Sequence, residues 1–189
     1  MKLCFATNNT NKLSEIQSLL GDELQLVSLQ DIGCDVDIPE PYDTIAENSK
    51  GKAQFVWDRY GINCFADDTG LEVFALKGEP GVLSARYAGP QKNADDNMNL
   101  LLQNLEIHPN KAARFITVIT LVIEGTFKQF EGIVEGTIIS SKQGGHGFGY
   151  DPIFIPENES RTFAEMTLEE KNSFSHRARA FSKLIDYLK

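Results

Sequence analysis

The sequence has little cysteine, and no two of its cysteines have the spacing of a metal-binding or redox pair. Only Cys4, Cys34 and Cys64 are present, so neither a disulfide framework nor a zinc site is indicated. We expect three buried free thiols in a reducing compartment. The sequence also has no run of about 18 apolar residues that could span a bilayer, and its N-terminal apolar run is too short for a signal peptide. We therefore expect a cytoplasmic protein with no membrane partner.

Positive charge is also scarce. The 189 residues include 18 Lys and Arg against 27 Asp and Glu, which gives a formal net charge of −9. Because binding along a nucleic-acid backbone requires a clustered excess of Lys and Arg, we expect no nucleic-acid partner. A small phosphorylated ligand is still possible, since a few local cations suffice to bind it. The composition, with 41% hydrophobic and 24% charged residues, is that of a folded globular protein.

Strand-like and helical patterns alternate along the chain. The predicted strands are residues 2–6, 24–28, 63–67, 113–123 and 126–139. The predicted helices are residues 11–20, ended by Gly21, and residues 44–60, 94–105 and 175–188. The last two strands flank Gly125 and are expected to form an antiparallel pair. This order predicts an α/β protein with a mixed, twisted central sheet flanked by helices, in two lobes with an active-site cleft between them. We expect a single domain over residues 1–189, with no separable linker.

A polar segment, Thr7-Asn8-Asn9-Thr10-Asn11-Lys12, directly follows the first predicted strand and opens the first helix. The N-terminus of a helix presents unpaired N–H groups and a partial positive charge to an anion. The side chains of this segment add donors, and Lys12 adds a full charge. The segment is thus similar to a phosphate-binding loop, although the Walker glycines are absent. The alternative is an ordinary helix cap with a solvated lysine.

Two adjacent carboxylates, Asp67 and Asp68, precede Thr69 at the predicted end of a strand. In an extended backbone they point to opposite faces, so one can face a cleft while the other braces the loop. A carboxylate beside a phosphorylated ligand can hold Mg²⁺ or orient an attacking water molecule. The alternative is a solvated turn. Glu40, in a loop constrained by two prolines, is a second candidate metal ligand.

A glycine-rich segment, residues 144–152, surrounds Phe148 and Tyr150 with four glycines. Glycine lets the backbone approach a flat ligand closely, and an aromatic ring that stacks on a nucleobase contributes about 1–3 kcal/mol. Asp151 can accept hydrogen bonds from N–H groups of a base. The alternative is a long hairpin turn whose aromatic rings cover the core.

A basic segment, residues 171–179, places His176 and Arg177 near the N-terminus of the last helix. A cation is unfavourable at that end of a helix unless an anionic partner is present. The segment therefore indicates an anion or a carbonyl-rich ligand nearby.

Five segments of the sequence resemble the inosine triphosphate pyrophosphatases, and they occur in that family's order. They are Ala6–Lys12, Ala66–Leu71, Pro80–Gly89, Gly147–Phe154 and Lys171–Arg179. The family hydrolyses ITP, dITP and XTP to the nucleoside monophosphate and pyrophosphate. It requires Mg²⁺ and usually forms a homodimer. The resemblance implies that this chain is a Mg²⁺-dependent, homodimeric nucleoside-triphosphate pyrophosphatase whose partner is a small purine nucleotide.

The resemblance also implies roles for individual residues. Asp68 would be catalytic, as a general base or as a metal ligand that orients water, and Glu40 would be a second metal ligand. The substrate-binding residues would be Thr7, Asn8, Asn9, Thr10, Asn11 and Lys12 for the triphosphate, Lys52 for a phosphate, Thr69 beside Asp68, Phe148 for stacking on the base, and Gly149, Tyr150, Asp151, Lys171, His176 and Arg177 for framing the base.

Two alternative functions remain open. One is a pyrophosphatase of related fold that acts on pyrimidine or modified nucleotides. The other is a nucleotide-binding module without catalysis, against which the Asp67-Asp68 pair and Lys12 argue.

Overall fold

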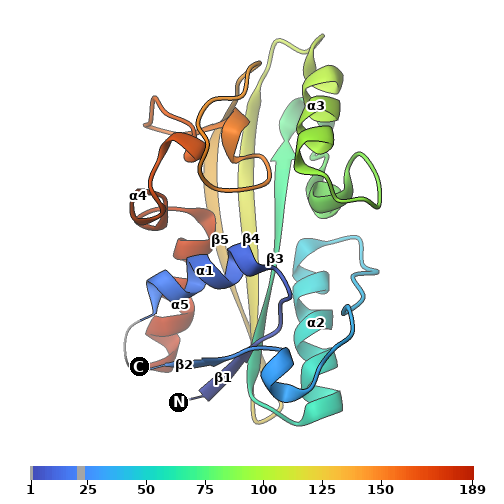
Figure 1. Cartoon of the computed structure of the whole chain (residues 1–189), viewed down its shortest axis with the longest axis vertical. Helices are drawn as coiled ribbons and strands as arrows, with labels where there is room; N and C mark the ends of the chain where they lie inside the picture. Colours follow the sequence, from blue (N-terminus) through green and yellow to red (C-terminus); the bar gives the residue numbers. More distant parts are fainter. Residues whose placement is uncertain (1, 21–23) are drawn as a thin grey trace. The chain divides into compact units, whose positions relative to one another are not determined.

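The computed structural model describes residues 2–20 and 24–189, so the predicted helix end at Gly21 lies outside the described residues. The described chain forms a six-stranded sheet in the order β2-β1-β3-β4-β5-β6, together with five helices (Figure 1). The strands are β1 (Lys2–Phe5), β2 (Gln25–Val27), β3 (Cys64–Val73), β4 (Ala112–Ile123), β5 (Thr126–Ile138) and β6 (Phe154–Pro156). The helices are α1 (Thr10–Leu19), α2 (Ile45–Tyr60), α3 (Ala94–Leu105), α4 (Leu168–Asn172) and α5 (His176–Leu188).

Two modes of strand pairing make the sheet mixed, as predicted. β1 pairs in parallel with both β2 and β3, whereas β6 is antiparallel to β5. The link between β4 and β5 consists of Glu124 and Gly125, both with positive φ (47° and 78°). A two-residue link of this kind joins antiparallel strands, which confirms the predicted hairpin at Gly125. No helix of the described chain is long and apolar enough to cross a membrane.

The chain divides into two compact units, and each of the strands β3, β4 and β5 contributes one part to each unit. The first unit comprises Met1–Asp68, Thr117–Gly132 and Arg177–Lys189, and the second comprises Thr69–Ile116 and Ile133–His176. Each unit has hydrophobic core residues of its own. The divisions fall between Asp68 and Thr69 and between His176 and Arg177, so each of these two predicted site segments contributes to both units.

In the first unit, alternate side chains of β1 and β3 enter different cores. Leu3, Phe5 and Phe65 pack with residues of α1 and α5, and the rings of Phe5 and Phe65 stack with centroids 4.5 Å apart. Cys4 and Cys64 are register partners and pack with residues of α2 instead. Both faces of these strands are therefore covered, which explains their almost continuous apolar sequence. All three cysteines are buried and free, as predicted.

The predicted helices begin and end within one residue of the observed ones. The strands agree less well: β6 (Phe154–Pro156) is absent from the predicted strands, and the predicted third strand ends at Asp67 whereas β3 continues to Val73. Asp and Gly are poor strand formers, and for that reason the sequence favours a turn there. Pairing with β4 in the sheet overrides this preference, whereas β1 pairs only with Cys64 and Phe65 at the start of β3.

The second unit has its core around α3. Met98, Leu101 and Leu105 of this helix belong to one buried cluster with Phe115 of β4. The ring of Phe115 also stacks on the imidazole of His176, with centroids 4.6 Å apart. The core of this unit therefore holds the first residue of α5 in place.

Candidate active site

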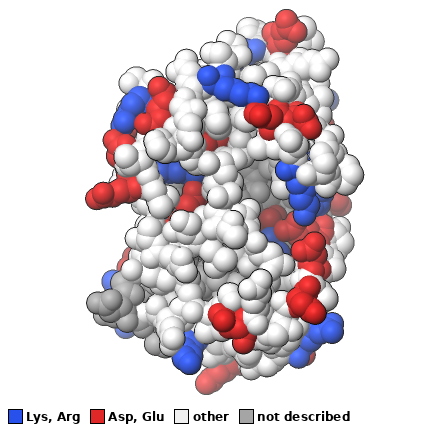
Figure 2. Space-filling view, in the orientation of Figure 1, with Lys and Arg blue, Asp and Glu red and all other residues white. Residues whose placement is uncertain are grey.

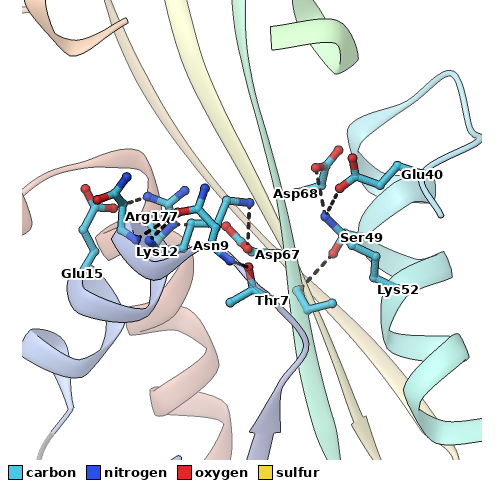
Figure 3. A network of polar contacts seen from close by, with 12 residues as sticks. Thr7, Asn9, Lys12, Glu15, Glu40, Ser49, Lys52, Asp67, Asp68 and Arg177 are labelled. Atoms are coloured by element: carbon cyan, nitrogen blue, oxygen red, sulfur yellow. Dashed lines mark hydrogen bonds and ion pairs between the residues drawn. The ribbon is translucent and has the colours of Figure 1, made fainter. Parts of the chain in front are cut away.

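Asp67 and Asp68 lie in the middle of β3 and point to opposite sides of the strand (Figure 3). Because side chains alternate along a strand, Asp67 shares the face of Phe65, which is covered by α1 and α5. Asp68 shares the face of Cys64 and Ala66, which is covered by α2. The predicted opposite orientation of the two carboxylates is thus confirmed, but they belong to a strand interior and not to its end.

Asp67 is held by two cations. Its Oδ1 atom lies 2.9 Å from Lys12 Nζ, and its Oδ2 atom accepts a hydrogen bond of 3.1 Å from Arg177 Nε. The Arg177 guanidinium group also pairs with Glu15, and both partners are buried. Burial alone would raise the pKa of Asp67, but the charges of Lys12 and Arg177 outweigh it and hold that pKa below its ordinary value. Asp67 is therefore ionised, and its ion pair with Lys12 fixes the position of that ammonium group.

Asp68 belongs to a separate group with Lys52 and Glu40. The Lys52 ammonium lies 2.7 Å from Glu40 Oε1 and 3.1 Å from Asp68 Oδ1, so one cation bridges two carboxylates. Burial raises the pKa of Asp68, and the nearby Glu40 charge raises it further against the opposing effect of Lys52. A raised pKa suits a carboxylate that must accept a proton during a reaction.

Helix α2 holds the loop that carries Glu40. Asn48, almost fully buried, accepts a hydrogen bond from the Tyr42 amide and donates one to the Tyr42 carbonyl, each 3.0 Å long. The Tyr42 ring lies so close to Gly51 that a Cβ atom there would collide with it. Asn48 and Gly51 are absent from the sequence-based predictions, although an amide and a glycine on one helical segment are a signal of close packing.

The segment from Thr7 to Lys12 begins helix α1. Asn9 caps the helix, because its Oδ1 atom accepts hydrogen bonds from the amides of Asn11 (3.0 Å) and Lys12 (3.2 Å). Thr7 accepts a bond of 3.2 Å from the Asn9 amide, and Asn8, Thr10 and Asn11 are exposed. The alternative of an ordinary helix cap thus describes Asn9. It does not describe Lys12, whose ammonium group is bound to Asp67 rather than solvated.

In the second unit, Asp151 closes the glycine-rich segment. Its Oδ2 atom accepts hydrogen bonds from the Phe148 amide (2.9 Å) and from Lys171 Nζ (2.6 Å). The Lys171 ammonium lies 4.9 Å from the centre of the Phe148 ring and 5.4 Å from that of Phe163. Gly147 has a φ of 73°, and a Cβ atom there would collide with the Asp151 carboxylate. Lys171 therefore forms one cluster with Phe148 and Asp151, although it follows Asp151 by 20 residues in the sequence.

Other predicted residues of the second unit have positions defined by protein contacts. The Tyr150 hydroxyl group donates a hydrogen bond of 2.8 Å to the Ser84 carbonyl, and the Tyr150 ring is buried. Gly149 has a φ of 62°, a backbone conformation that favours glycine. Thr69 is partly exposed on β3. Tyr150 therefore anchors the segment, while Phe148 and Thr69 remain partly accessible.

The sequence indicates an anionic partner for the cations at the start of α5. For Arg177 the protein itself supplies partners, Asp67 and Glu15, so the structure places this guanidinium group in the first unit with Lys12. His176 lies in the second unit, where it stacks on Phe115. Glu15 is absent from the sequence-based predictions, and its only sequence signal is its position beside Ile16 on the buried side of α1.

Charged side chains are intermixed on the face drawn in Figure 2, where blue and red residues alternate. This face therefore has no broad field of positive charge that could attract a polyanion. Lys12 and Arg177 are the cations placed beside Asp67, and Lys52 lies beside Asp68.

A model of the Ham1 family matches residues 3–187. The chain belongs to the Ham1 family. It is 58% identical over 188 residues to the dITP/XTP pyrophosphatase of Flavobacterium johnsoniae, with 100% of this chain and 98% of that protein covered. It is 54% identical to the dITP/XTP pyrophosphatase of Porphyromonas gingivalis, with 99% and 97% covered.

Solved structures also resemble this Ham1-family chain. The Ham1 protein of Staphylococcus aureus matches with a TM-score of 0.91 and 35% identity, with 100% of this chain and 98% of that one covered. A protein described as nucleoside-triphosphatase / dITP/XTP pyrophosphatase from Mycobacterium abscessus matches with a TM-score of 0.81 and 40% identity, with 98% and 99% covered. The predicted family and the predicted mixed α/β fold are thereby confirmed.

The donor atoms of this Ham1-family chain fit a magnesium ion. Within residues 2–20 and 24–189, no three His, Cys, Asp or Glu side chains form a ready-made metal site. Asp68 and Glu40 nevertheless share one cation, the Lys52 ammonium group. Mg²⁺ commonly binds through one or two carboxylates together with substrate phosphates and water. Two carboxylates around a shared cation are therefore an adequate donor set.

Proposed function

We propose that this chain hydrolyses ITP, dITP and XTP to the nucleoside monophosphate and pyrophosphate and so removes them from the nucleotide pool. The observation that carries the proposal is the Lys52 ammonium group, which pairs with both Asp68 and Glu40, while the adjacent Asp67 pairs with Lys12. Full-length similarity to proteins named dITP/XTP pyrophosphatase supports it. A buried carboxylate with a raised pKa beside phosphate-binding cations suits hydrolysis better than binding alone.

In the proposed reaction, Lys12 and the exposed polar groups at the start of α1 bind the triphosphate, and Lys52 contacts a phosphate. Asp68 orients a water molecule and accepts its proton while the oxygen attacks the α-phosphorus and the bond to the β-phosphate breaks. Asp68 and Glu40 would also hold Mg²⁺, which would supply positive charge to the phosphate oxygens. The protein contributes mainly positioning and preorganised charge.

The second unit is proposed to bind the base. Phe148 is only partly buried and would stack on the purine, with Gly149, Tyr150 and Asp151 shaping the segment around it. Lys171 and His176 are candidate donors to the 6-carbonyl group of hypoxanthine or xanthine. Adenine carries an amino group at that position, and a donor opposed to a donor disfavours it.

We also propose that the protein acts as a homodimer in the cytoplasm. Phe74 and Leu83 of the second unit are large hydrophobic side chains that are 46% and 45% exposed, and a second copy would cover them. Three buried free thiols suit a reducing compartment. Light scattering on the purified protein, compared with a Leu83→Asp variant, tests the dimer. A wild-type monomer would contradict it.

Chromatographic analysis of reaction products tests the proposed activity. ITP, XTP, GTP, ATP and a pyrimidine nucleotide are each incubated with the protein, with Mg²⁺ or with a chelator. We expect monophosphate and pyrophosphate from ITP and XTP, only with Mg²⁺, and much slower turnover of GTP and ATP. Orthophosphate plus diphosphate would contradict the reaction type. Preferred pyrimidine turnover would favour the related pyrophosphatase, and binding without turnover would favour a nucleotide-binding module.

A further inference from the structure

A chain of buried hydroxyl groups connects α2 to the strand that carries the two aspartates. Ser49 of α2 and Thr120 of β4 are both fully buried. The Ser49 Oγ atom lies 3.1 Å from the Ala66 carbonyl oxygen and 2.9 Å from Thr120 Oγ1. Gln129 of β5 approaches Thr120 Oγ1 to 3.0 Å with its Nε2 atom, which also lies 2.9 Å from the Ala46 carbonyl oxygen.

The direction of each hydrogen bond in this chain follows from the number of hydrogens available. A carbonyl oxygen only accepts, so Ser49 donates its single hydroxyl hydrogen to Ala66. Thr120 must then donate to Ser49, and its own oxygen accepts from Gln129. All hydrogen bonds of the series therefore point in one direction, from the Gln129 amide through the two hydroxyl groups to the Ala66 carbonyl, and each bond polarises the next.

This series of hydrogen bonds ends at the peptide group that precedes the two aspartates of β3. The Ala66 carbonyl belongs to the peptide bond that joins Ala66 to Asp67, next to Asp68. Ser49 precedes Lys52 by three residues, so both side chains project from the same side of α2. One turn of the helix thus holds the backbone before the aspartates, and the next turn holds Asp68 through Lys52 (Figure 3).

We propose that Ser49 is a positioning residue for catalysis, whose hydroxyl group, oriented by Thr120, fixes the Ala66–Asp67 peptide and so sets the position of Asp68 relative to Lys52. This inference rests on the proposed function, in which Asp68 acts on the attacking water. Small displacements of a catalytic group slow a reaction strongly, because the reacting atoms must be aligned within a fraction of an ångström.

Three variants test the proposal: Ser49→Ala, Thr120→Val and Thr120→Ser. The kcat and KM for ITP are measured with Mg²⁺ and expressed per folded enzyme. We expect Ser49→Ala to lower kcat by about 10- to 100-fold, as for a displaced catalytic group, with a smaller change in KM. Thr120→Val keeps the shape but removes the donor to Ser49, so kcat falls in the same direction. Thr120→Ser keeps the hydroxyl group and retains most of the wild-type kcat.

A second measurement does not depend on activity. Hydrogen–deuterium exchange of the peptide that contains Ala66 to Thr69 is recorded without nucleotide or metal, and we expect faster exchange in Ser49→Ala than in the wild type. A kcat per folded molecule equal to that of the wild type would overturn the proposal. If the wild type hydrolyses no nucleotide, the proposed function fails on its own, and unchanged exchange in Ser49→Ala would then overturn the positioning of this peptide by Ser49.

Discussion

Replacing Arg177 by methionine tests the buried charge cluster around Asp67. Arg177 is fully buried, and its guanidinium group pairs with both Asp67 and Glu15. Methionine retains much of the side-chain length and its apolar surface but removes the charge. The change leaves Glu15, which is 3% exposed, and Asp67, which is 1% exposed, without this guanidinium group.

The expected loss of stability is large, because breaking a buried ion-pair network by removing one partner costs about 3–5 kcal/mol. For a protein of this length, each kcal/mol corresponds to about 2–4 °C in Tm, so the variant should melt about 6–20 °C below the wild type. A surface pair provides the control. Arg161 and Glu170 are 44% and 43% exposed, and because solvent screens such a pair, Arg161→Met should leave Tm close to that of the wild type.

Urea and thermal unfolding, followed by circular dichroism at pH 7 without nucleotide, measure these effects. The partner variant Glu15→Gln and the double variant complete a thermodynamic cycle. The double variant should be more stable than the sum of the single losses predicts, because it no longer buries the Glu15 charge without Arg177. A loss of less than about 1 kcal/mol in Arg177→Met, or strict additivity in the double variant, would refute the reasoning.

Three further predictions concern other parts of the chain. Phe148→Ala should remove about 1–3 kcal/mol of base stacking, and steady-state kinetics with ITP should show a higher KM; an unchanged KM would exclude stacking on this ring. Gly144→Ala should destabilise the protein by about 1–3 kcal/mol in urea unfolding, because φ is +86° and a Cβ atom would collide with the Ala164 backbone. Gly145→Ala, where nothing lies within 4 Å, should stay within about 0.5 kcal/mol of the wild type; equal losses would contradict the steric argument. Burial raises the pKa of the Cys64 thiol from 9.0 to about 12, so above pH 9 the unfolded chain releases this proton first and stability falls, by up to about 1.4 kcal/mol per pH unit. The stability advantage of the wild type over Cys64→Ala should therefore shrink between pH 8 and pH 10.5, and a constant difference would contradict this assignment.

Much of the fold follows from local sequence patterns. The period of the apolar residues predicts helices whose observed ends differ little from the predicted ones, and the predicted start of α2 at residue 44 coincides with its capping residue, Thr44. Strand β3 differs because local propensity at Asp67 and Gly70 favours a turn, whereas pairing with β4 in the sheet keeps this segment extended. A local pattern does not reveal that pairing.

The candidate site was accessible from the sequence only in part. Strand alternation predicts that Asp67 and Asp68 face opposite sides, because this property is local. The partners of each carboxylate depend on contacts between distant segments: Glu15 and Arg177 are 162 residues apart, and Ser49 and Thr120 are 71 apart. No local pattern marks such pairs, so Glu15 and Ser49 emerge only from the structure.

The two aspartates are proposed to differ in role: Asp68 acts in catalysis, whereas Asp67 holds Lys12 in position. The kcat of Asp68→Asn for ITP hydrolysis with Mg²⁺ tests the role of Asp68 most directly. Pyrophosphate release is measured at saturating ITP, and the Tm of the variant is recorded to show that it remains folded. We expect kcat to fall by about 10²-fold or more, as for the loss of a general base, with the fold intact. Turnover close to that of the wild type would contradict the assignment of Asp68 as the catalytic residue.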